Sequence, residues 1–174
     1  KTTTNINLGA CLAQKGKKVL MVDIDPQGNT TSGIGIRKRM LQYTIYDLLV
    51  DDDIPASKVI LPTKTENLFL IPASVDLAGA EVELANLEGR EKRLKKAIDS
   101  VRADFDYILI DCPPSLGILT INSLTAVDSV LIPIQCEFYA LEGVSQLIST
   151  IELVKKNMNP NLFIEGVILS MFDG

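Results

Sequence analysis

Short runs of apolar residues, separated by longer stretches with helical periodicity, most constrain how this chain can fold. The runs include residues 19–22, 108–110, 130–132 and 167–169. Each is continuously apolar, which predicts strands that are buried on both faces. The sequence therefore predicts an α/β fold: a doubly wound, mostly parallel sheet with helices on both faces. In such a fold, ligands bind at the carboxyl ends of the strands.

The predicted strands and helices alternate along the chain. We expect strands at 18–23, 67–72, 107–111, 129–133 and 163–171, and helices at 2–14, 45–50, 55–60, 75–86, 90–101, 119–126 and 139–156. Gly16, flanked by two lysines, should end the first helix. The polar residues after the first strand, up to Gly35, are interpreted as a loop.

Length and composition predict a single domain that covers residues 1–174. The chain has 174 residues, 47% of them hydrophobic, and it contains no repeat or linker-like tract. No apolar segment approaches the length that spans a bilayer, and no basic and apolar leader opens the chain. We therefore expect a cytoplasmic protein that does not bind membranes.

The residue types that are absent restrict the possible chemistry. The chain has no histidine, which excludes Ser-His and Cys-His nucleophilic catalysis and histidine-bound metals. Its cysteines, Cys11, Cys112 and Cys136, lack the spacing of a zinc site and are interpreted as small apolar fillers. A net charge of −5 argues against strong nucleic-acid binding by global electrostatics. Any reaction must use Asp, Glu, Lys, hydroxyl groups and a metal.

Three aspartates follow predicted strands. Asp23 and Asp25 follow the first strand and Asp111 ends the strand at 107–111. The carboxyl ends of parallel strands meet at one edge of a sheet, where the first helix also begins with Lys1 and Thr2. Taken alone, the threonines could be an ordinary helix cap. Together with the aspartates, they predict a site for phosphoryl transfer.

Each of these residues has a predicted role in that site. The Lys1 ammonium would contact the β- and γ-phosphates of ATP, and the Thr2 hydroxyl would bind Mg²⁺. Asp111 would hold Mg²⁺ through a water, as a Walker B aspartate does. Asp25 would position or polarise the attacking water, and Asp23 would support Asp25. The predicted cofactors are therefore ATP and Mg²⁺.

Four motifs resemble those of the ParA/Soj family of chromosome and plasmid partitioning ATPases, a deviant Walker A branch of the MinD/ParA superfamily. They are residues 1–4, 22–29, 111–117 and 133–143. The resemblance implies that Lys1 is the P-loop lysine, Thr2 the Mg²⁺ ligand, Thr3 a phosphate contact, Asp25 the water-activating residue and Asp111 the Walker B aspartate. It also implies an ATP-dependent homodimer, non-specific DNA binding, a ParB-type partner protein and association with the nucleoid.

The chain departs from that family at both ends. The glycine-rich loop, with the lysine that the family sends across the dimer interface, does not precede Lys1, and the adenine-contacting and DNA-binding segments do not precede Gly174. We therefore expect the chain to be an internal fragment of a P-loop ATPase domain. The fragment should be inactive by itself, whereas the full-length protein should hydrolyse ATP.

Alternative functions remain open. A MinD-like positioning ATPase or a non-catalytic nucleotide-binding module would share most of these residues. A nitrogenase iron-protein relative would need cluster-binding cysteines, and Cys112 and Cys136 do not match that pattern. A dinucleotide-binding oxidoreductase could use Asp23 to hold a ribose. Such a protein has no need for Lys1 and Thr2, however, and Asp111 would repel a pyrophosphate.

Overall fold

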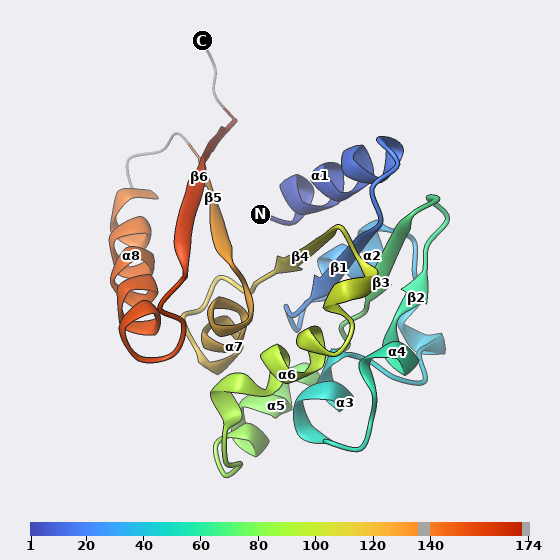
Figure 1. The fold of residues 1–174 in the computed structure, drawn as a ribbon, viewed down its shortest axis with the longest axis horizontal. Helices are drawn as coiled ribbons and strands as arrows, with labels where there is room; N and C mark the ends of the chain where they lie inside the picture. Colours follow the sequence, from blue (N-terminus) through green and yellow to red (C-terminus); the bar gives the residue numbers. More distant parts are fainter. Residues whose placement is uncertain (136–139, 172–174) are drawn as a thin grey trace.

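Two sheets organise the protein, whose computed structural model describes residues 1–135 and 140–171 (Figure 1). The first sheet has the order β2-β3-β1-β4. Its strands are β1 (Val19–Asp23), β2 (Leu61–Pro62), β3 (Leu68–Ile71) and β4 (Tyr107–Asp111). β1 lies parallel to β3 and β4, and the short edge strand β2 runs antiparallel to β3. The second sheet pairs β5 (Ser129–Gln135) in parallel with β6 (Phe163–Ser170).

Helices connect these strands. The α-helices are α1 (Thr2–Gln14), α2 (Asn29–Gly33), α3 (Ile45–Val50), α4 (Ala56–Val59), α5 (Leu77–Leu84), α6 (Arg93–Asp99), α7 (Ile118–Ala126) and α8 (Ala140–Asn157). Short 3-10 turns accompany them, among them η1 (Lys38–Met40), η2 (Arg90–Lys92) and η3 (Arg102–Asp104). In the described ranges, no helix is both long and apolar enough to cross a bilayer.

The centre of the protein is β1, in which all five residues are buried. Val19 and Met21 belong to a cluster that α1 covers, together with Ala13. Leu20 and Val22 belong to a larger cluster on the other face, to which α3, α5, α6 and α7 contribute. Successive strand residues point to opposite faces, so helices on both sides bury the strand completely, as its apolar sequence predicts.

The described strands and most of the predicted helices confirm the sequence analysis, and Gly16 ends α1 with a positive φ of 78°. Some details were wrong. The predicted loop up to Gly35 contains α2, the predicted helix at 75–86 is shortened to α5, and β2 was not predicted. The expected helix start at residue 139 lies outside the described residues.

The predicted helix at 90–101 is divided into η2 and α6, and η3 follows it. Asn122 on α7 explains the first break. Its side-chain oxygen accepts a hydrogen bond from the Leu94 N–H at 3.1 Å, and its side-chain nitrogen donates to the Arg90 carbonyl at 2.8 Å. These bonds satisfy backbone groups that a continuous helix would pair internally, so the backbone can change direction there.

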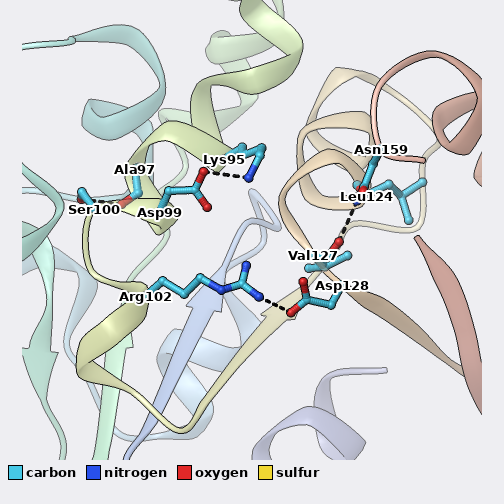
Figure 2. A network of polar contacts seen from close by, with 9 residues as sticks. All are labelled: Lys95, Ala97, Asp99, Ser100, Arg102, Leu124, Val127, Asp128 and Asn159. Carbon is cyan, nitrogen blue, oxygen red and sulfur yellow. Dashed lines mark hydrogen bonds and ion pairs between the residues drawn. The ribbon is translucent and has the colours of Figure 1, made fainter. Parts of the chain in front are cut away.

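Polar contacts and α7 join the two sheets (Figure 2). Asn159 follows α8, and its side-chain nitrogen donates to the carbonyls of Leu124 at 3.0 Å and Val127 at 2.7 Å. Arg102, in η3, forms an ion pair with Asp128, which precedes β5. In the described part of the chain, β4 pairs with β1 alone and β5 pairs with β6 alone. The predicted single sheet is therefore divided between β4 and β5.

Candidate functional site

The start of α1 offers free backbone donors beside the sheet. No side-chain hydrogen bond caps the helix at Lys1, and its first turn contains no acidic residue. The Lys1 carbonyl accepts a bond from the Asn5 N–H at 3.0 Å, which closes the first turn. Unpaired N–H groups and the helix dipole favour an anion at such a position. The Lys1 side chain is exposed, and Thr2 is half-buried.

A glycine lets α1 approach the sheet closely. A Cβ atom added at Gly9 would lie 2.8 Å from the Met21 sulfur in β1. A side chain there would force the Met21 side chain or the helix to shift. Gly9 therefore allows α1, which begins with Lys1 and Thr2, to pack closely against β1. Figure 1 shows the chain beginning beside the gap between β4 and the second sheet.

Asp23 and Asp111 lie side by side, because they are register partners at the ends of the parallel strands β1 and β4. Both are buried. Burial raises the pKa of Asp23, hydrogen bonds from Thr31 and from the Asp25 N–H oppose that shift, and the neighbouring charge of Asp111 raises the pKa further. The sequence analysis correctly expected these two carboxylates at one edge of the sheet.

Asp25 lies in the turn that follows β1. Its Oδ1 accepts a hydrogen bond from the Gln27 N–H at 2.9 Å, and its carbonyl accepts one from the Gly28 N–H at 2.8 Å. Its own N–H is bonded to Asp23 Oδ1 at 3.3 Å. Gly28 has a φ of 58°, a left-handed conformation that glycine adopts at little cost. Asp23 thus supports the Asp25 turn, and Asp25 Oδ2 is not used in these bonds.

Two threonines that sequence reasoning missed complete the arrangement. The Thr30 hydroxyl donates to Asp111 Oδ2 at 2.7 Å, and the Thr31 N–H and hydroxyl each donate to Asp23 Oδ2 at 2.7 Å. The Thr31 hydroxyl oxygen also accepts a bond from the Ala73 N–H at 3.0 Å. Both threonines are fully buried at the start of α2. The sequence signal that could have identified them is the pair of consecutive threonines directly after Gly28 and Asn29.

Cys112 lies next to Asp111, at the same edge of the sheet. Burial raises the pKa of Cys112 to about 11, and a hydrogen bond with Ser123 lowers it. The charges of Asp111 and Asp25 raise the pKa of Cys112 as well, whereas that of Lys1 lowers it. All three predicted site residues therefore lie within electrostatic range of one thiol.

The other cysteines differ from Cys112. Cys11 is exposed on α1, so its interpretation as a buried filler was wrong. Cys136 lies outside the described residues.

The residues at this edge fit Mg²⁺ and a nucleotide. Within the described ranges, no group of three or more Asp, Glu, Cys or His side chains could hold a metal by itself. Mg²⁺ usually takes one or two protein oxygens together with waters and substrate phosphates. Asp111 and the Thr2 hydroxyl supply oxygens of that kind, and the start of α1 supplies donors for phosphate.

A helix start with Lys-Thr, beside two aspartates that end parallel strands, is typical of the class of P-loop nucleoside triphosphatases. Residues 1–164 match the family described as AAA domain, to which the chain belongs. The chain is 60% identical over 173 residues to the sporulation initiation inhibitor protein Soj of Bacillus subtilis strain 168, covering 99% of this chain and 68% of that protein. It therefore belongs to the Soj/ParA family of chromosome partitioning ATPases.

The chain is also similar to a second partitioning protein and to a solved structure with a different name. The chromosome partitioning protein ParA of Myxococcus xanthus is 55% identical, and the match covers 99% of this chain and 61% of that protein. The crystal structure of cobyrinic acid a,c-diamide synthase from Mycobacterium smegmatis, with bound ATP analog and magnesium, has a TM-score of 0.93 and 41% identity, and the match covers 99% of this chain and 70% of that one. The chain thus spans about two thirds of the length of these relatives.

Proposed function

We propose that the full-length protein is a Mg²⁺-dependent ATPase that drives the partitioning of a chromosome or plasmid. The proposal includes an ATP-dependent homodimer, non-specific binding to nucleoid DNA and a ParB-type partner that stimulates hydrolysis. The observation that carries the ATPase activity is the meeting of the uncapped α1 start with Asp111 and Asp25 at one edge of the sheet. The 60% identity to Soj supports the partitioning role.

The proposed binding roles follow from charge and position. The Lys1 ammonium and the N–H groups at the start of α1, including that of Thr3, attract the phosphates of ATP. The Thr2 hydroxyl would hold Mg²⁺ directly and the Asp111 carboxylate would hold it through a water, and the metal would supply positive charge next to the phosphates. Lys1 would also stabilise the negative charge of the phosphates during the reaction, because it contacts the transferred group.

Asp25 is the proposed water-positioning residue. The Gln27 N–H holds its Oδ1, and the turn closed by Gly28 fixes its backbone. This arrangement leaves Asp25 Oδ2 as an acceptor for the proton of an attacking water. A carboxylate held in one orientation can align that water with the γ-phosphate without a large motion.

The central test is Asp25→Ala in the full-length protein. ATP binding should stay within a few-fold of wild type, because Asp25 is not a proposed phosphate or metal ligand. Hydrolysis should fall by roughly 10²-fold or more, the scale of lost water positioning. The ATP-bound dimer should then accumulate, which light scattering measures.

A matched control is Asp99→Ala, which removes an aspartate that is ion-paired with Lys95 on α6, outside the proposed site. It should leave both ATP binding and turnover near wild type. Normal turnover by the Asp25→Ala protein would show that Asp25 does not serve the reaction.

A second candidate function is ATP-dependent amide synthesis. It is favoured by one observation: a crystal structure of cobyrinic acid a,c-diamide synthase from Mycobacterium smegmatis has a TM-score of 0.95 to this chain, with 42% identity. The higher identity to Soj favours partitioning. Stimulation of ATP hydrolysis by DNA with a ParB-type partner supports partitioning. Stimulation by a carboxylic acid with an amide donor, without DNA, would instead support amide synthesis.

A further inference from the structure

Thr30 occupies a position that no proposed role explains. Its side chain is fully buried, and its hydroxyl donates to Asp111 Oδ2 at 2.7 Å. Thr30 lies in α2, directly after the turn that contains Asp25. One hydroxyl therefore links the end of β4 to the chain segment that follows β1. Among the described residues, this is the hydrogen bond that the Asp111 carboxylate accepts from a side chain.

We propose that Thr30 is a positioning residue for Asp111 and that it couples the metal site to the Asp25 turn. The inference rests on the proposed function, because it takes Asp111 as a Mg²⁺ ligand. With Oδ2 held by Thr30, the carboxylate presents Oδ1 to a metal or to a metal-bound water. Loss of a partner that orients a metal ligand typically weakens metal binding by about 10- to 100-fold.

The packing around α2 makes Thr30 a rigid support. Thr31 fastens the helix to Asp23 and to the backbone of Ala73 after β3. On its other side, α2 lies against α1, where a Cβ at Gly33 would come within 2.6 Å of Ile6 Cδ1. The helix that carries Thr30 is therefore held between α1 and the ends of β1, β3 and β4. A shift of Asp111 on metal binding would be transmitted to α2, and from there to the Asp25 turn.

The test compares Mg²⁺ dependence in full-length variants. Thr30→Val keeps the shape of the side chain and removes the hydroxyl. We expect the apparent Mg²⁺ dissociation constant, measured by calorimetry with a non-hydrolysable ATP analogue, to rise roughly 10- to 100-fold. Nucleotide binding in EDTA should be unchanged. At saturating Mg²⁺, kcat should remain reduced while KM for ATP stays within a few-fold, because the Asp25 turn has lost its link to the metal site.

Two further variants act as controls. Thr30→Ser restores the hydroxyl and should return the Mg²⁺ dissociation constant to within a few-fold of wild type. Thr125→Val removes another buried hydroxyl, which donates to the Ile121 carbonyl within α7. It should not change the Mg²⁺ dependence. If Thr30→Val does not fold, Thr30→Cys replaces it, since a thiol donates only weakly.

The possible outcomes separate the two proposals. A wild-type protein whose nucleotide binding is independent of Mg²⁺ would overturn the proposed function. A wild type with Mg²⁺-dependent binding, combined with Thr30 variants that match it, would overturn the positioning role alone. Both the proposed function and the positioning role are supported if Thr30→Val loses Mg²⁺ affinity, Thr30→Ser restores it and Thr125→Val does not change it.

Discussion

The four-stranded sheet and the β5–β6 sheet have similar apolar sequences but very different surroundings. Val22 in β1 is fully buried, whereas Val167 in β6 is 52% exposed. Further apolar side chains of the second sheet are also exposed, including Leu131, Phe163 and Leu169. An apolar strand sequence therefore predicts a strand well, but its burial depends on how many helices cover it.

The proposed aspartates lie in the well-covered sheet and not in the more exposed β5–β6 sheet. Asp23, Asp25 and Asp111 all belong to the end of the well-covered sheet, where α1 and α2 pack against it. Rigid surroundings hold such side chains in place and lower the cost of organising a site. The second sheet is joined to that region mainly through α7 and the contacts shown in Figure 2.

The largest expected effect compares the same substitution in the two sheets. Val22→Ala removes buried methyl groups from the main core and should lower the free energy of unfolding by roughly 2 to 3 kcal/mol. Val167→Ala should change it by less than about 0.5 kcal/mol, because the side chain is half-exposed. Urea denaturation of the full-length variants measures both. Equal losses would break the comparison, since they would mean that another part of the protein covers β6.

An intermediate effect concerns the buried carboxylate at the end of β1. The pKa of Asp23 is raised from an ordinary value of 3.8 in the folded protein, mainly by burial. Its contribution to stability is therefore complete below pH 3.8 and is lost as the pH rises through the folded pKa. Relative to Asp23→Asn, the wild type should lose up to about 1.4 kcal/mol per pH unit in that window.

Denaturation of both proteins at a series of pH values measures this difference. Subtracting the free energy of unfolding of Asp23→Asn from that of the wild type removes the contributions of groups that titrate equally in both proteins. A wild type that gains stability over Asp23→Asn as the pH rises would contradict the raised pKa and would mean that the hydrogen bonds from Thr31 outweigh burial.

The smallest effect concerns the ion pair between the two regions. Arg102→Ala breaks the contact with Asp128. The Arg102 side chain is 47% exposed and the Asp128 side chain is 73% exposed. Exposed pairs are worth at most about 1 kcal/mol, so unfolding should change little and less still at high salt. Lys95→Ala breaks a similarly exposed pair inside α6 and serves as the control. A loss above about 2 kcal/mol for Arg102→Ala alone would show that this pair holds the sheets together.

Sequence reasoning located the strands and the aspartates because both depend on local patterns. Continuous apolar runs give β1 and β4, and parallel pairing then brings Asp23 and Asp111 into register. It missed Thr30 and Thr31, because their partners lie 81 and 8 residues away and a polar run after a turn looks like a loop. The break before α6 was missed for the same reason, since it depends on Asn122 in α7.

The division of the sheet has a practical consequence for handling the protein. In the described ranges, β4 and β5 each have one side without a strand partner. Such edges present rows of backbone N–H and C=O groups that can recruit a strand from another molecule. We therefore expect the isolated chain to self-associate through these edges as its concentration rises. The division between β4 and β5 thus leaves the chain with two strand edges through which it can aggregate.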